Sequence, residues 1–146
     1  MQICDFLFPK DKVAYIISSA NMQEALEKLE QTQYTAIPVI DGEGKYVGTL
    51  SEGDLLWKMK YTAGLSFENL DTVKVHEIKR RIHNECVSIN AYLEDMLELA
   101  ADQNFVPVVD DNQIFIGIIR RKNIIEYYTS NITDWSLTNR LDQADD

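Results

Sequence analysis

Three consecutive basic residues, Arg120, Arg121 and Lys122, stand where an apolar, strand-forming run ends and a predicted helix begins. Guanidinium groups bind phosphate oxygens through charge-assisted hydrogen bonds, each worth about 1.5–3 kcal/mol. The first backbone N–H groups of a helix, together with its dipole, also favour an anion at that place. The pattern therefore predicts a phosphate-binding site, with a solvated helix end as the alternative interpretation of such a triplet.

A second strand-to-helix turn, earlier in the chain, carries different chemistry. Ser51, Glu52 and Asp54 follow a matching apolar run. Ser51 and Asp54 have the spacing of an N-cap pair, which stabilises a helix by about 0.5–2 kcal/mol. Hydroxyl and carboxylate groups also suit ribose hydroxyls better than phosphate. We therefore predict two clefts of unequal chemistry, of which the one beside the basic triplet accepts phosphate.

Patterns typical of enzymes and metal sites are missing from the sequence. Its two cysteines and two histidines show neither Cys-x-x-Cys nor paired ligand spacing. No signature of a nucleophile accompanies them. The glycines within 42–48 lie between two predicted strands, which favours a hairpin turn over a phosphate loop. We therefore expect no metal, no required cofactor and no enzymatic activity; a nucleotide hydrolase or kinase is the rival from that class.

Both turns belong to an internal repeat. Four landmark residues of the first copy recur in the second at a constant offset of 69 residues: Pro38 as Pro107, Asp41 as Asp110, Gly48 as Gly117, and Asp54 as Asn123. Two copies of one unit usually bury their apolar faces against each other, and ligands bind along the seam. The repeat therefore predicts a pseudo-twofold molecule with its sites between the copies.

Each copy predicts the order strand, helix, strand, strand, helix (β-α-β-β-α), which is an α/β fold. For the first copy we expect strands at 13–17, 36–40 and 45–50, a helix capped by Asn21 and Glu24, and a helix from Ser51 to about Lys60. For the second we expect strands at 85–89, 106–109 and 114–119 and a last helix to about Tyr128. The expected divisions are repeat 1 with its lead-in at 1–60, a connector at 61–75, repeat 2 at 76–129 and a C-terminal tail at 130–146.

Composition narrows the class of protein. A net charge of −10 argues against nucleic-acid binding, which relies on many Lys and Arg contacts to phosphate. No apolar run approaches the ~20 residues of a membrane helix, and the first residues lack the features of a signal peptide. With only two cysteines, no disulfide framework is implied. We therefore expect a cytoplasmic protein without a membrane partner.

The doubled motif, an apolar-Pro-Val-apolar-Asp run followed by Gly-apolar-apolar and then Asp or Asn, resembles a tandem pair of CBS domains, also called a Bateman module. The resemblance covers about residues 8–128. Lys12-Val13-Ala14, the segment 34–38 and Arg121-Lys122 are similar to those of the small stand-alone CBS pairs of Gram-positive bacteria. Those proteins bind cyclic di-AMP, and some control partner proteins such as a stringent-response synthetase.

The resemblance implies that each nucleotide lies between the first two strands of one repeat and the strand-to-helix turn of the other. Its first site would use Lys12, Ala14, Tyr34, Thr35, Ala36, Ile37, Arg120, Arg121, Lys122 and Asn123. Backbone groups of Ala14 and Ala36 would meet the adenine edge, with Ile37 on its face. Tyr34 would stack or hydrogen-bond and Thr35 would contact ribose or phosphate, while Lys12, Arg121 and Lys122 neutralise the phosphates. A second site would use Ser51, Asp54, Cys86, Asn104, Phe105 and Val106, with Asp54 as the ribose-binding acid.

The resemblance also implies a disc-like homodimer that binds an adenine nucleotide and signals occupancy to a protein partner by shifting a conformational population. Cyclic di-AMP is the leading ligand, and AMP, ADP or ATP, as in an energy-sensing module, is the alternative. A ligand-free scaffold is the remaining class. On this interpretation Arg121→Ala weakens binding of a phosphorylated ligand more than tenfold. The number of occupied sites and the identity of the partner stay open.

Overall fold

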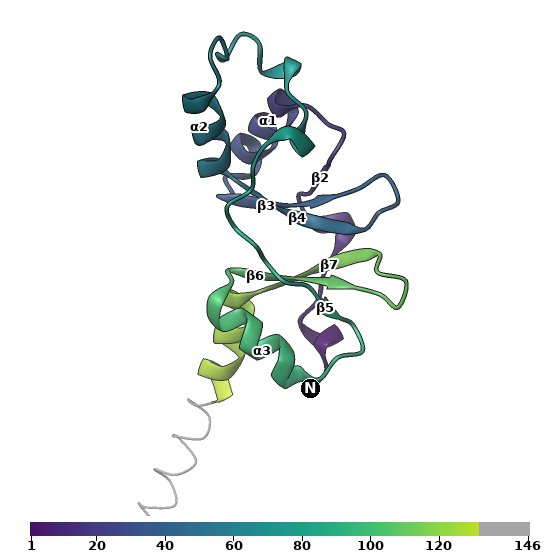
Figure 1. Ribbon diagram of the computed structural model, residues 1–146. Helices are drawn as coiled ribbons and strands as arrows, with labels where there is room; N and C mark the ends of the chain where they lie inside the picture. Colours follow the sequence, from purple (N-terminus) through teal and green to yellow (C-terminus); the bar gives the residue numbers. More distant parts are fainter. Residues whose placement is uncertain (132–146) are drawn as a thin grey trace, which may run out of the picture.

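Two β-sheets, one from each repeat, face each other across the middle of the molecule, and helices cover their outer faces (Figure 1). The computed structural model describes residues 1–131. The tail expected at 130–146 therefore lies outside the described residues, apart from its first two. The architecture confirms the predicted α/β pair of repeats.

The first repeat is a three-stranded sheet backed by two helices. Its elements are β2 (Ile16–Ile17), α1 (Met22–Thr32), β3 (Ala36–Ile40), β4 (Tyr46–Ser51) and α2 (Glu52–Tyr61). The strand order is β2-β3-β4, with β2 parallel and β4 antiparallel to β3. Between β3 and β4, the chain makes the predicted hairpin turn, in which Gly44 has a φ of 87° that glycine adopts without steric cost.

The second repeat has the same topology and gains one extra edge strand. Its elements are β5 (Val87–Ser88), α3 (Leu93–Asp102), β6 (Phe105–Val109), β7 (Phe115–Arg120) and a helix over 121–131. The sheet order is β1-β7-β6-β5, because the N-terminal β1 (Phe8–Pro9) pairs antiparallel with β7. Two short 3₁₀ helices, η1 (Ile3–Phe6) and η2 (Lys10–Lys12), flank β1. Two more, η3 (Leu70–Thr72) and η4 (Val75–Glu77), lie between α2 and β5.

Side-chain caps fix where α1 and α2 begin. The Asn21 side chain accepts a hydrogen bond from the backbone N–H of Glu24 at 2.9 Å, and the Glu24 carboxylate accepts one from the N–H of Asn21 at 3.1 Å. Ser51 and Asp54 form the same reciprocal pair at the start of α2. Both caps predicted from the sequence are confirmed, and they fix the residues at which the two helices begin.

The first strand of each repeat is shorter than predicted. Instead of 13–17 and 85–89, the strands span Ile16–Ile17 and Val87–Ser88. The reason lies in the pairing, because β2 meets β3 only at Val39 and Ile40. The chain before Ile16 instead follows the seam, where Val13 is buried in a cluster shared by both repeats. The backbone of this segment therefore runs beside the space between the two sheets instead of pairing with β3.

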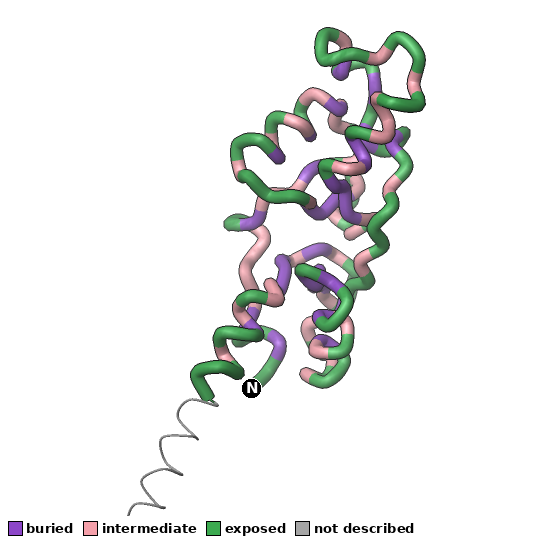
Figure 2. Tube along the Cα trace, turned by 90° about the vertical axis from the view of Figure 1, so that its left-hand side faces the viewer, coloured by how far each residue is buried: buried purple, intermediate pink, exposed green. Residues whose placement is uncertain are grey.

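Three apolar clusters hold the molecule together. One lies inside each repeat, between its sheet and its helices. The third joins the repeats and contains Val13, Ile40, Phe105, Phe115 and Ile118. Figure 2 shows the buried residues gathered in the interior of each half, with exposed residues on the outer helical turns. Because the third cluster draws on both sheets, the seam has a fixed shape.

Tyr46 forms a hydrogen bond between the two repeats. Its hydroxyl donates to the carbonyl of Asn84, in the segment before β5, at 3.0 Å and lies 2.6 Å from the Thr49 hydroxyl. Burial raises the pKa of Tyr46 to about 12, so the hydroxyl keeps its proton and remains a donor at neutral pH. Nearby, the backbone N–H of Phe115 donates to the carbonyl of Gly44 at 2.9 Å, which joins the two hairpins.

Candidate functional site

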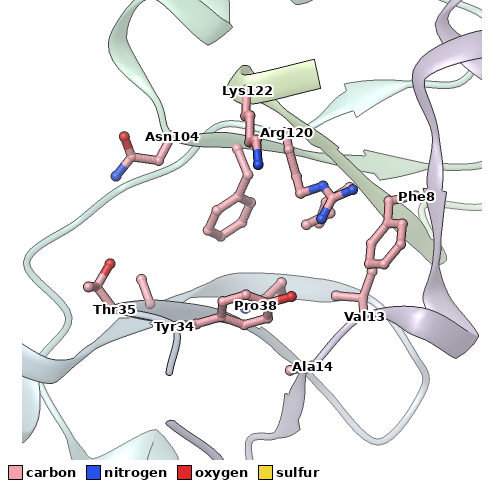
Figure 3. Close-up of a pocket in the computed structure, with 12 residues that line it drawn as sticks. Phe8, Val13, Ala14, Tyr34, Thr35, Pro38, Asn104, Arg120 and Lys122 are labelled. Atoms are coloured by element: carbon pink, nitrogen blue, oxygen red, sulfur yellow. The ribbon is translucent and has the colours of Figure 1, made fainter. Parts of the chain in front are cut away.

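A cavity of about 230 Å³ opens between the two repeats (Figure 3). From the first repeat it is lined by Ala14, by the segment 34–36 and by Pro38. From the second repeat it is lined by Asn104, Phe105, Ile118, Arg120 and Lys122, and Phe8 and Val13 of the lead-in complete it. The cavity thus joins the first strands of one repeat to the strand-to-helix turn of the other.

The inner walls of the cavity are apolar. Val13, Pro38, Phe105 and Ile118 are all buried in the structure. A pocket with such walls and a few converging polar groups is the usual form of a small-molecule site. Its apolar walls suit a ring system with apolar faces.

Arg120 supplies an unsatisfied polar group at this cavity. Among residues 1–131, its Nε is the single buried side-chain nitrogen or oxygen without a hydrogen-bond partner. The guanidinium carbon lies 4.2 Å from the centre of the Phe8 ring, a cation–π contact that holds the side chain in place. A buried donor left unpaired costs about 1–3 kcal/mol. An acceptor placed in the cavity would remove that cost.

Lys122 is the second cation of the cavity and is weakly held. Its Nζ lies 3.9 Å from a carboxylate oxygen of Glu126, with side chains 79% and 62% exposed. An ion pair this exposed contributes about 0–1 kcal/mol, so it offers little resistance to a ligand that competes for the lysine. Lys122 and Arg120 reach from the second repeat toward the wall that carries Tyr34 and Thr35 (Figure 3).

Two segments of the chain, residues 3–61 and 75–130, match the CBS domain family. The chain belongs to the CBS domain family. The match falls on both repeats and confirms the tandem CBS pair expected from the doubled motif.

Relatives of known ligand share this CBS pair. The chain is 29% identical over 131 residues to cyclic di-AMP receptor B of Bacillus subtilis (strain 168), covering 87% of this chain and 86% of that protein. A crystal structure of CbpB in complex with c-di-AMP superimposes with a TM-score of 0.81 at 26% identity, over 93% of this chain and 89% of that one. The CbpB protein of Listeria monocytogenes in complex with c-di-AMP gives 0.76 at 27% identity, over 90% and 97%.

Six of the ten residues expected in the first CBS site lie together in the cavity: Ala14, Tyr34, Thr35, Ala36, Arg120 and Lys122. The other four lie outside its lining. Lys12 is exposed at the end of η2, Ile37 is fully buried in the core of the first repeat, and Asn123 is half-buried in the last helix. Arg121 turns to the end of α3, where its Nε donates to the carbonyl of Ala100 at 2.8 Å.

The residues expected in the second CBS site do not share one cavity. Asn104 and Phe105 line the first cavity, and Val106 is fully buried. Cys86 borders a separate hollow of about 460 Å³ beside the segments 46–48 and 83–85. Ser51 and Asp54 lie at the start of α2, where they bond each other, and Asp54 also accepts from the backbone N–H of Arg81.

Four lining residues were not predicted: Phe8, Val13, Pro38 and Ile118. Ile118 stands two positions before Arg120 on β7, so strand alternation places both on one face. Pro38 can be found in the same way, two positions after Ala36 on β3. Phe8 carries no such signal, because β1 joins the sheet through a pairing remote in sequence.

Asp54 has both carboxylate oxygens engaged within the protein. One accepts from the N–H of Ser51 at 2.9 Å, and the other accepts from the N–H of Arg81 at 3.0 Å. The side chain is buried, with the residue 1% exposed. In this structure the carboxylate thus joins the start of α2 to Arg81, in the segment that precedes β5.

Asp54→Ala should lower the free energy of unfolding by about 2–4 kcal/mol, because the buried N–H of Ser51 and the partly buried N–H of Arg81 lose their acceptor. Urea denaturation measures the change. Asn123→Ala, at the equivalent position of the second CBS repeat, is the matched control and should cost under about 1 kcal/mol. If Asp54 acts instead as a ribose-binding acid, its replacement will weaken nucleotide binding and leave unfolding nearly unchanged.

No group of three or more His, Cys, Asp or Glu side chains within residues 1–131 is arranged to hold a metal ion. In the same described part of the chain, no helix has the length and apolarity to cross a membrane.

Proposed function

We propose that this CBS pair is a regulatory nucleotide-binding protein whose ligand is cyclic di-AMP. The observation that carries the proposal is the buried, unpartnered Nε of Arg120 beside an apolar cavity between the repeats. Such a site requires a ligand with a flat apolar ring and a nearby anionic acceptor. The similarity to proteins named or crystallised as cyclic di-AMP receptors supports the same choice.

The base would lie against the first repeat. Ala14 precedes β2 and has no strand partner, so its backbone N–H and carbonyl are available to an adenine edge. Ala36 lines the same cavity, and we assign its carbonyl to the same edge of the base. Adenine offers a ring nitrogen as acceptor and an exocyclic amine as donor, which complements these groups. Tyr34, 43% exposed at the mouth, would cover the outer face of the base.

The phosphates would lie against the second repeat. We assign their recognition to Arg120 and Lys122, because the guanidinium of Arg121 is bonded to the carbonyl end of α3. Arg120 would gain the acceptor that its Nε lacks, and Lys122 would exchange its weak pair with Glu126 for a phosphate oxygen. Two cations at one cavity favour a ligand with more than one phosphate.

A chemical difference at the turn favours the cyclic dinucleotide over AMP, ADP or ATP. Asn123, in the first turn of the last helix and outside the cavity lining, stands where the other repeat has Asp54. A carboxylate there could hold both hydroxyls of a free ribose, whereas an uncharged amide is a weaker partner. In a 3′,5′-cyclic dinucleotide the 3′ oxygen is esterified and only the 2′ hydroxyl is free. AMP, ADP and ATP have two free hydroxyls on the ribose and would lack the carboxylate partner for them at this position.

The cavity would hold one half of such a ligand. Its volume of about 230 Å³ falls below the ~300–1,000 Å³ of pockets that enclose a drug-sized molecule. The second half would therefore lie over the mouth, beside exposed Lys122 and Tyr34. Part of the ligand would then belong to the surface that another protein meets.

Signalling would follow from linkage rather than catalysis. A ligand that favours one arrangement of the repeats shifts the population of the surface that a partner binds. We further propose a cytoplasmic homodimer formed through the outer helices. Leu56 on α2 and Ile125 on the last helix occupy equivalent positions of the two repeats and are 60% and 55% exposed. A symmetric dimer would cover both.

Calorimetric titration with cyclic di-AMP, AMP, ADP and ATP, combined with thermal unfolding, tests the proposal. Cyclic di-AMP should bind saturably and, at a hundredfold excess over its Kd, add about 2.7 kcal/mol to the free energy of unfolding. Tight binding of AMP or ATP without cyclic di-AMP would establish the energy-sensing alternative. A melting temperature unmoved by all four would indicate a ligand-free scaffold.

A further inference from the structure

Repeat symmetry relates the cavity to a second cleft that can be located residue by residue. Ile16 pairs with Val39 in the first sheet, and Val87 pairs with Val108 in the second. Glu85, two positions before Val87, is therefore the counterpart of Ala14. The same comparison of β3 with β6 makes Phe105 the counterpart of Ala36. The backbone groups proposed to read adenine in the first cleft thus have known equivalents in the second.

In the second cleft the side chain of Gln103 already occupies those equivalents. Its Oε1 accepts from the N–H of Glu85 at 2.8 Å. Its Nε2 donates to the carbonyl of Glu85 at 3.1 Å and to the carbonyl of Phe105 at 3.1 Å. Gln103 is 7% exposed, its bond to Phe105 is buried and its two bonds to Glu85 are partly buried. A carboxamide presents an acceptor beside a donor, which is the pattern of the adenine edge.

The first cleft has no such occupant. Among residues 1–131, no side chain bonds the backbone of Ala14 or the carbonyl of Ala36. Tyr34 holds the place of Gln103 when residues are counted back from the strand, and it is 43% exposed. The cause is one extra residue between α1 and β3, Gln33, which takes a left-handed φ of 59°. In the second repeat Gln103 itself follows α3 directly and lies two residues before β6.

We propose that Gln103 acts as a built-in substitute for the base and closes the second cleft, so that each chain binds one nucleotide, in the cavity of Arg120. This inference rests on the proposed function insofar as the ligand carries adenine. Charge acts in the same direction: the turn beside the second cleft carries Ser51 and Gly53 where the first cleft has Arg120 and Lys122. A phosphate at that turn would meet a hydroxyl and a glycine instead of two cations. The Gln103 side chain and the lack of cations therefore close the second cleft, while the first cleft remains open to a nucleotide.

Removing the Gln103 side chain should therefore open a second site. The protein (residues 1–146) is first saturated with cyclic di-AMP, and bound adenosine is then counted by equilibrium dialysis. Adenosine is the probe because it lacks phosphates, for which the turn at Ser51 and Gly53 offers no cation. We expect no adenosine on the natural protein and one per chain on Gln103→Ala. Gln33→Ala, at the exposed end of α1, is the matched control and should bind none.

A measurement on the unmodified protein covers the case in which Gln103→Ala does not fold. The side-chain NH₂ signals of Gln103 in an NMR spectrum should be protected from hydrogen exchange and should stay so at saturating nucleotide. Two nucleotides per natural chain, loss of that protection on binding, or a folded Gln103→Ala that takes up no adenosine would each overturn the inference. Failure of cyclic di-AMP to bind at all would instead refute the proposed ligand, and the gain of an adenosine site by Gln103→Ala would still be measurable without it.

Discussion

Arg120→Ala will weaken cyclic di-AMP binding by about 30-fold or more and leave the protein folded. Truncating one partner of a buried, hydrogen-bonded charge pair costs about 2–5 kcal/mol of binding free energy. Stability should change little, because two effects oppose each other. The variant loses the cation–π contact with Phe8, worth about 0.5–2 kcal/mol. It also loses a buried, unpaired donor whose burial costs a similar amount.

Arg121→Ala is the matched control for that experiment. It removes the same charge from the adjacent residue, but its guanidinium bonds the carbonyls of Ala100 and Ala101 at 2.8 and 3.5 Å. We expect binding within about threefold of the natural protein and a loss of about 1 kcal/mol in stability. Calorimetric titration and urea denaturation of both variants separate the two roles. The reverse ranking of affinities would place the phosphates on Arg121, as the resemblance alone implies.

Gly117→Ala should both destabilise the fold and weaken the ligand. A Cβ at this position would collide with the backbone carbonyl of Phe8. It would also lie 2.8 Å from Cδ1 of Leu7 and 3.1 Å from the Cα of Pro9. Because backbone cannot move aside cheaply, β1 would leave the edge of β7. Phe8 would go with it and release the guanidinium of Arg120. We expect a loss of about 1–3 kcal/mol in stability and about tenfold in affinity.

The fold supplies its own control in Gly48→Ala. Gly48 is the equivalent residue of the first repeat, with a φ of 158° against 157° for Gly117. A Cβ there would lie 2.5 Å from Nε of Arg80, a flexible side chain that can shift. Backbone strain is thus common to the two variants and cancels in their difference. Denaturation midpoints that fall equally for both would show that the packing of β1 is not responsible.

The architecture was predictable because its signals are local and repeated. The paired prolines and glycines, the apolar runs between them and the caps at Asn21 and Ser51 all describe short stretches of chain. Each copy of the repeat also checks the other, since a pattern seen twice at a constant offset is unlikely to arise by accident. The hairpin at Gly44 follows from the same kind of evidence.

The orientation of side chains at the seam was not predictable in the same way. Arg120 ends β7 and Arg121 begins a helix, so two identical, adjacent residues face different surroundings. Sequence alone assigns them the same chemistry. The contact of Phe8 with Arg120 depends on a strand pairing across more than a hundred residues of chain, which no local pattern encodes.

Gln103 shows a further limit of reading a repeat by analogy. The sequence shows only that the segment between α3 and β6 is one residue shorter than the segment between α1 and β3. In the structure this shorter segment places the Gln103 side chain where it hydrogen-bonds the backbone of Glu85 and Phe105. A symmetric motif therefore predicts two clefts, and the packing at one residue decides how alike they are.

A crystal structure of the protein grown with cyclic di-AMP tests the central claim most directly. The account predicts one ligand per chain in the cavity between the repeats, with adenine against the backbone of Ala14 and Ala36. A phosphate oxygen should lie about 2.7–2.9 Å from Nε of Arg120. A ligand bound beside Ser51 and Asp54, or a phosphate held by Arg121 with Nε of Arg120 still unpaired, would contradict it.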